Sequence, residues 1–147
     1  MRSAILSGLL MLISAHACAD SLQDQVSRCR SLADASAALM RDADSRPLAG
    51  GQSLIAAMKL RLSRPVEVVD LSPIAELRGI RVEPDAVTIG AMTRHADVAS
   101  SSPLRTLIPG LANLAGGIAD RMVRSMGTLG GSLANNDPAA DYPAAAL

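Results

Sequence analysis

The chain has 147 residues, of which 49% are hydrophobic and 19% charged, so it is long enough and apolar enough to bury a core. Its 14 basic and 14 acidic residues cancel, and without a basic stripe neither a nucleic acid nor a membrane surface is expected as the main partner. With one tyrosine, no phenylalanine and no tryptophan, the core is expected to consist of leucine, isoleucine, valine, methionine and alanine.

The first residues resemble a secretory signal peptide. Arg2 supplies a positive charge, an apolar run follows from Ala4 to Ile13, and small residues precede Asp20. The run is too short to cross a bilayer as a helix, which takes about 20 residues. We therefore interpret residues 1–19 either as a signal peptide of an exported protein or as a misassigned start.

The cysteines and histidines do not form a metal-binding pattern. Cys18 and Cys29 are not a CxxC pair, and His16 and His95 lie far apart along the chain. A metal or iron–sulfur site requires several converging ligands. We predict no metal site, an ordinary thiol at Cys29 and a structural role for His95, without a general acid or base.

Helices and strands are predicted in chain order from hydrophobic spacing and from capping residues. Ser31 and Asp34 have the spacing of a capping box, and apolar residues extend that helix to about Asp42. A strand at 46–49 leads into a helix at 53–62, and Pro65 precedes a strand at 66–70.

The second half of the chain shows the same mixture of short elements. A helical turn is predicted at 73–77, strands at 80–82 and 87–91, a helix to about 99 that Thr93 caps, and a helix at 103–115 that is interrupted near Pro109. A polar turn is predicted at 125–128, a loop at 135–138 and a last helix from about Ala139. The mixture predicts the α+β fold class.

A first glycine-rich turn joins the predicted strand to the helix that begins at Ser53. Gly50 and Gly51 permit a positive φ and let main-chain N–H groups approach an anion, and the helix start adds unpaired N–H donors. Ser53 has two roles open to it, as a helix cap or as a donor to a phosphate oxygen. Alone, such a turn is more often a plain tight turn. Its candidate binding residues are Leu48, Ala49, Gly50, Gly51, Gln52 and Ser53.

A second glycine-rich turn, at 127–132, combines paired glycines with flanking hydroxyls, and carboxylate and amide side chains suited to sugar hydroxyls follow it. Its candidate binding residues are Thr128, Leu129, Gly130, Gly131, Ser132, Asn135 and Asp141. Neither turn is a Rossmann fingerprint or a Walker loop. The two turns together predict a diphosphate held from two sides. Arg121 and Arg124 flank the second turn and are interpreted either as further anchors or as solvated surface residues.

These motifs, in this order, resemble the FAD-binding medium subunit of molybdenum hydroxylases, the group of xanthine dehydrogenase and carbon monoxide dehydrogenase. The stretches that carry the resemblance are 49–54, 59–61, 89–93, 123–124, 127–132 and 137–144. The match extends from about Ser31 to Leu147, whereas residues 1–30 do not match. The resemblance therefore assigns 31–147 to the N-terminal part of an FAD-binding domain.

The resemblance implies an incomplete FAD-binding domain of the vanillyl-alcohol-oxidase type (PCMH type), with its first two lobes in part. It implies that 49–53 and 128–132 hold the FAD diphosphate, that Asp141 meets ribityl or ribose hydroxyls, and that Asn135 lies beside it. It further implies a cytoplasmic flavoprotein oxidoreductase subunit, which passes electrons from an iron–sulfur subunit, fed by a molybdopterin subunit, to an acceptor. Since members of the family are longer, one alternative is a non-catalytic truncated gene fragment. The signal-like N-terminus favours another, an exported nucleotide- or phosphate-binding module.

Overall fold

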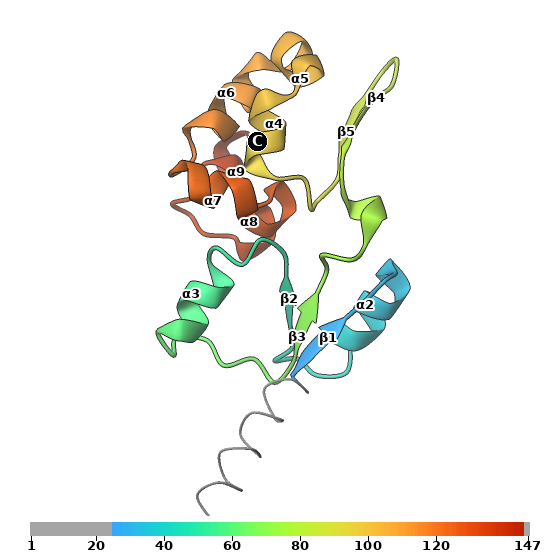
Figure 1. Cartoon of the computed structure of the whole chain (residues 1–147), viewed down its shortest axis with the longest axis vertical. Helices are drawn as coiled ribbons and strands as arrows, with labels where there is room; N and C mark the ends of the chain where they lie inside the picture. Colours follow the sequence, from blue (N-terminus) through green and yellow to red (C-terminus); the bar gives the residue numbers. More distant parts are fainter. Residues whose placement is uncertain (1–24, 146–147) are drawn as a thin grey trace, which may run out of the picture.

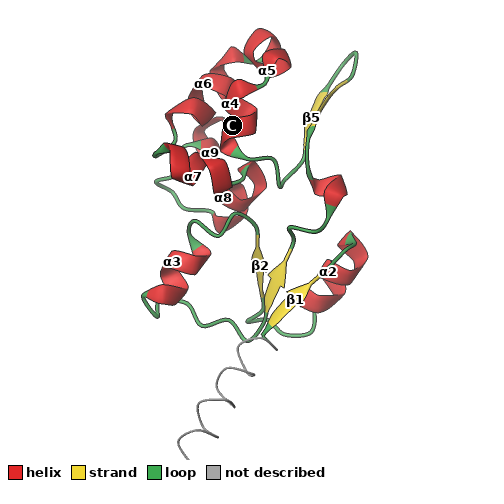
Figure 2. Ribbon diagram, in the orientation of Figure 1, coloured by secondary structure: helices red, strands yellow, loops and turns green. Residues whose placement is uncertain are grey.

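The computed structural model describes residues 25–145, so the signal-like segment predicted at 1–19 lies outside the described residues. A three-stranded sheet with a helix on either side forms one part of the structure, and a group of helices with a β-hairpin forms the other (Figure 1). Figure 2 shows that the first part combines strands and helices, whereas helices dominate the second. This mixture confirms the predicted α+β class.

The sheet is parallel and has the order β1-β3-β2, formed by β1 (Val26–Arg28), β2 (Arg46–Leu48) and β3 (Val68–Asp70). Val68 of the central strand pairs with Val26 on one side and Arg46 on the other. The first two residues of β3 are buried, as expected for a central strand covered on both faces. The carboxyl ends of all three strands therefore meet at one edge of the sheet.

Two helices accompany the sheet. The helix α2 (Leu32–Leu39) begins at Ser31, whose hydroxyl accepts a hydrogen bond of 3.1 Å from the main-chain N–H of Asp34, which confirms the predicted cap. It packs on β3 around a small core of Cys29, Ala35, Ala38, Val69 and Ile74. The helix α3 (Leu54–Lys59) is shorter than predicted, and the side chain of Ser53 makes no capping hydrogen bond.

The connection to the second part runs through a 3₁₀ turn, η1 (Ala75–Leu77), and an antiparallel hairpin of β4 (Ile80–Val82) and β5 (Val87–Ile89). The remaining helices are α4 (His95–Ser100), α5 (Ser102–Leu107), α6 (Pro109–Gly117), α7 (Arg121–Met126), α8 (Leu129–Asn135) and α9 (Tyr142–Ala145). Their shared core consists of Val98, Leu104, Ala112, Ala115 and Tyr142. The only tyrosine of the chain thus belongs to this core, in addition to the predicted aliphatic residues.

Three local predictions are wrong. The N-cap residue of α4 is Arg94 and not Thr93. The buried Thr93 hydroxyl bonds instead with the main chain of Gly79, at 3.1 Å to both the N–H and the carbonyl oxygen. The first two residues of the predicted polar turn at 125–128 belong to the end of α7, a helix capped by Asp120, and only 127 and 128 connect it to α8. The second glycine-rich turn is the first turn of α8, which Thr128 caps.

Among residues 25–145, no helix combines the length and the apolar character that crossing a bilayer requires.

The helical core predicts the effect of removing one large side chain. Leu104 is fully buried, so Leu104→Ala is expected to lower the free energy of unfolding by about 2–5 kcal/mol. Leu60, which is 71% exposed, is the matched control, and Leu60→Ala is expected to change it by less than about 0.5 kcal/mol. Urea denaturation monitored by circular dichroism measures both free energies of unfolding. Equal changes in the two variants would contradict the placement of Leu104 in the core.

Candidate functional site

The two glycine-rich segments lie against each other. A Cβ atom added to Gly50 would lie 2.2 Å from the carbonyl oxygen of Met126 and 2.7 Å from the Cα of Gly127. A Cβ added to Gly131 would lie 3.1 Å from the Cβ of Ala49. The two segments are separated by most of the described chain, yet they approach to a distance that only residues without side chains permit.

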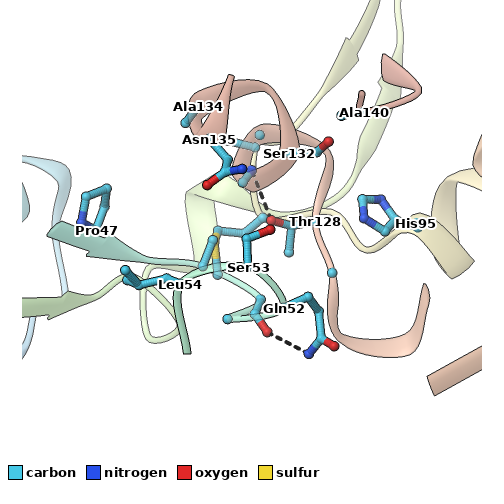
Figure 3. Close-up of a pocket in the computed structure, with 18 of the residues that line it drawn as sticks. Pro47, Gln52, Ser53, Leu54, His95, Thr128, Ser132, Ala134, Asn135 and Ala140 are labelled. Atoms are coloured by element: carbon cyan, nitrogen blue, oxygen red, sulfur yellow. Dashed lines mark hydrogen bonds between the residues drawn. The ribbon is translucent and has the colours of Figure 1, made fainter. Parts of the chain in front are cut away.

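A cavity of about 460 Å³ opens between these segments, beside the carboxyl end of β2. Its volume lies within the range of roughly 300–1,000 Å³ that is typical of small-molecule sites. The residues predicted from sequence that line it are Ala49, Gly50, Gly51, Gln52, Ser53, Thr128, Gly130, Gly131, Ser132, Asn135 and Asp141. Figure 3 shows Gln52, Ser53, Thr128, Ser132 and Asn135 gathered around it. Leu48 and Leu129 do not line it, and Leu129 packs against the helical core.

The first turn lines this cavity and has main-chain donors that are unpaired in the part of the chain that the structure describes. Gly51 has a φ of 71°, which turns the chain from β2 into α3, and the Gln52 side-chain amide donates to the Gly50 carbonyl at 3.1 Å. Within residues 25–145, the N–H groups of 50–54 have no acceptor, as is usual at a helix start that lacks a side-chain cap. Unpaired N–H groups at such a position favour an anion.

The second segment does not present its main-chain donors in this way. The N–H of Leu129 donates to the Thr93 carbonyl at 3.0 Å, and the N–H of Gly130 donates to the Ala91 carbonyl at 2.8 Å. The N–H of Gly131 donates to the hydroxyl oxygen of Thr128. The argument from free main-chain amides at paired glycines therefore applies to the first turn and not to the N–H groups of 129–131. What this segment offers to a ligand is the hydroxyls of Thr128 and Ser132.

The arginines around the second segment are engaged with main-chain carbonyls. Arg124 donates to the carbonyls of Ile118 and Ala119, each at 2.7 Å, and so stabilises a turn in which Ala119 has a positive φ. Arg121 is exposed on α7 and does not line the cavity. Neither arginine is placed as an anchor for a negative ligand.

His95 is one of several residues of the cavity wall that were not expected from the sequence. His95 is only 5% exposed, lines the cavity, and has its Nδ1 at 3.2 Å from the hydroxyl of Tyr142. Burial lowers the pKa of His95, and the nearby carboxylate of Asp141 opposes this shift. Burial, followed by the Asp141 charge, raises the pKa of Tyr142 to about 12. An isolated histidine in a sequence carries no signal for such a position.

The architecture and the cavity define an α+β domain with a cavity at the carboxyl edge of a parallel sheet, where ligands of open α/β sheets commonly bind. Comparison with known families makes this specific, because residues 21–147 match the family described as the FAD binding domain in molybdopterin dehydrogenase. The chain belongs to this family. The match confirms the family resemblance seen in the sequence and FAD as the cofactor of the domain.

Individual relatives agree with this assignment. The chain is 48% identical over 118 residues to the carbon monoxide dehydrogenase medium chain of Afipia carboxidovorans, a match that covers 80% of this chain and 41% of the relative. It is 31% identical over 115 residues to the xanthine dehydrogenase FAD-binding subunit of Escherichia coli O157:H7, covering 78% and 39%. The solved carbon monoxide dehydrogenase of Hydrogenophaga pseudoflava superposes with a TM-score of 0.81 at 43% identity, covering 82% of this chain and 42% of that one. The chain thus spans about two fifths of the length of these relatives.

The close approach of the two segments predicts that the site tolerates no side chain at position 50. Gly50→Ala places its Cβ against main-chain atoms of 126–127, so it is expected to lower the free energy of unfolding by about 1–3 kcal/mol. In Gly110→Ala, the matched control on α6, the new Cβ has no neighbour within 4 Å, and stability is expected to stay equal or rise by up to about 1 kcal/mol. Urea denaturation measures the free energy of unfolding of both variants. An unchanged free energy of unfolding in Gly50→Ala would contradict the close contact between the two segments.

Proposed function

We propose that this chain binds FAD in the cavity between the two glycine-rich segments, with the diphosphate between the start of α3 and the start of α8. The observation that supports this most directly is the cavity itself, which is lined by residues 50–54, whose N–H groups are unpaired within residues 25–145, and by Thr128 and Ser132, which carry hydroxyls. Hydrogen bonds to a charged acceptor are stronger than those to a neutral one, so a diphosphate suits these donors.

The same cavity holds groups suited to the sugar portions of the dinucleotide. Asn135 ends α8, and Asp141 directly precedes α9, so both lie on the wall that the second segment begins. An ionised carboxylate only accepts hydrogen bonds, which suits the hydroxyls of a ribityl or ribose chain. We assign Asp141 to these hydroxyls and Asn135 to a neighbouring contact.

We further propose that the chain acts in an FAD-containing subunit of a molybdenum-containing hydroxylase or dehydrogenase. When bound, FAD supplies the ability to accept electrons from one partner and to pass them to another. The partners in this proposal are an iron–sulfur subunit and a molybdopterin subunit, and the compartment is the cytoplasm. The proposal is supported by the family match and by relatives whose names describe them as medium chains or FAD-binding subunits.

Binding of FAD is tested directly by titrating the purified 147-residue chain and following the quenching of flavin fluorescence. The hydroxyls of Ser53 and Ser132 line the cavity and have no hydrogen-bond partner within the described residues. Ser53→Ala and Ser132→Ala are therefore expected to weaken binding by about tenfold each without loss of stability. Ser36, exposed on α2 and outside the cavity, is the control, and Ser36→Ala should bind FAD as the unaltered chain does.

Two results would contradict the assignment of the cavity. An unaltered chain that is folded by circular dichroism but has no affinity for FAD would remove FAD binding from this chain. Equal affinities for all three serine variants would show that FAD binds elsewhere.

The proposed assembly predicts co-purification. A tagged chain, expressed in its native cells, is expected to be recovered from the cytoplasmic fraction together with an iron–sulfur polypeptide and a molybdopterin-containing polypeptide. Mass spectrometry identifies the polypeptides, and metal analysis of the recovered complex identifies iron and molybdenum. Recovery of the chain alone would contradict the partners, and recovery from the periplasm as a protein that begins at Asp20 would contradict the compartment.

A further inference from the structure

His95 is held in one place on the cavity wall. Its main-chain N–H donates to the carbonyl of Gly127 at 3.0 Å, and the edge of its ring lies against the same glycine. A Cβ added to Gly127 would lie 2.6 Å from Nε2 and 2.8 Å from Cδ2 of the imidazole. The ring is therefore packed against the segment that carries Thr128, and it is not a mobile surface side chain.

The contact with Tyr142 selects one tautomer of His95. Because burial lowers the pKa of His95, the ring is neutral at pH 7 and carries its proton on one nitrogen only. Because burial raises the pKa of Tyr142 to about 12, the phenol keeps its proton and has to donate it. Within residues 25–145, Nδ1 of His95 is the only hydrogen-bond partner of this hydroxyl. Donation from Tyr142 to Nδ1 therefore satisfies both groups, and it leaves the imidazole proton on Nε2.

The protonated nitrogen is accessible from the cavity. Nε2 has no hydrogen-bond partner within the described residues, although His95 as a whole is buried. In the same part of the chain, the only side-chain polar atom that is both buried and without a partner is the Oγ of Ser45. Because Nε2 has no partner and is not among the buried unpaired atoms, it is accessible to solvent. His95 lines the cavity, so we infer that Nε2 is reached from there. Figure 3 shows the ring at this wall, near Thr128.

We propose that His95 donates its Nε2–H to an acceptor oxygen of the dinucleotide bound in this cavity, and that Tyr142 acts as a positioning residue by holding the tautomer. This inference rests on the proposed function. It adds a third segment of the chain, the start of α4, to the two glycine-rich segments. It also gives Tyr142 a role beyond core packing, since Tyr142 directly follows Asp141 along the chain and its hydroxyl contacts His95.

Two substitutions at position 95 distinguish the proposed hydrogen bond from Nε2 from the packing of the ring. The shorter asparagine puts its amide near the position that Nδ1 occupies, so His95→Asn keeps a hydrogen-bond partner for Tyr142 and loses the donor at the position of Nε2. The longer glutamine places its amide near Nε2, so His95→Gln retains that donor. His95→Asn is expected to raise the dissociation constant for FAD by about tenfold, and His95→Gln by clearly less. Titrations with ADP, which lacks the ribityl chain, and with riboflavin, which lacks phosphate, locate the acceptor oxygen.

A spectroscopic measurement tests the tautomer independently of binding. In ¹⁵N NMR spectra of the histidine-labelled chain without FAD, His95 is expected to have an unprotonated Nδ1 and a protonated Nε2, and the His95→Asn spectrum identifies its signals. Tyr142→Phe, which keeps the ring and removes the hydroxyl, is expected to produce a mixture of tautomers. Addition of FAD is expected to shift the Nε2 signal of the unaltered chain.

The outcomes distinguish this inference from the function on which it rests. A proton on Nδ1 would overturn it whether or not FAD binds. Normal FAD binding by the unaltered chain with equal affinity of the His95→Asn variant would overturn it while leaving the proposed function intact. A folded chain with the expected tautomer and no affinity for FAD would overturn both.

Discussion

The structure depends on the contact between the turn at 49–51 and the segment at 126–131. These residues come from the sheet and from the helical part of the domain, and their main chains approach so closely that a single added carbon at Gly50 would overlap a carbonyl oxygen. The cavity lies beside this contact and is lined by residues of both segments. The glycines therefore matter first as residues that allow the two parts to join, and only then as residues that allow a ligand to approach.

The two sides of the cavity are built differently. On the side of α3, the helix start has no side-chain cap, so its main-chain N–H groups stay unpaired. On the side of α8, Thr128 caps the helix, and hydrogen bonds to Ala91 and Thr93 fix its first turn. One side thus supplies amide donors, and the other supplies hydroxyls on a main chain that is already held in place. In this arrangement a diphosphate would supply acceptors for the unpaired N–H groups at the start of α3. At the start of α8 it would bind hydroxyls and would not have to displace the main-chain hydrogen bonds to Ala91 and Thr93.

Local chemistry accounts for what the sequence predicted correctly. Ser31 and Asp34 mark the start of α2, and two glycines between a strand and a helix mark the first turn, because the signals and the structures that they predict involve neighbouring residues. The α8 helix was missed because paired glycines disfavour a helix when judged alone, whereas tertiary hydrogen bonds to Ala91 and Thr93 support it. The α7 helix also has a local signal, because the side chain of Asp120 caps its start. The place of His95 could not be predicted, because its partner Tyr142 is 47 residues away.

The cavity lies where the sheet and the helical part of the domain meet, and this has a thermodynamic consequence. A ligand seated there touches both parts at once, so it acts as an additional link between them. Any ligand that binds only the folded chain stabilises it by an amount that grows with the logarithm of its concentration. Occupation of this junction would therefore make the two parts unfold more cooperatively, and the resistance of the chain to heat and to proteases would follow the supply of ligand in the cell.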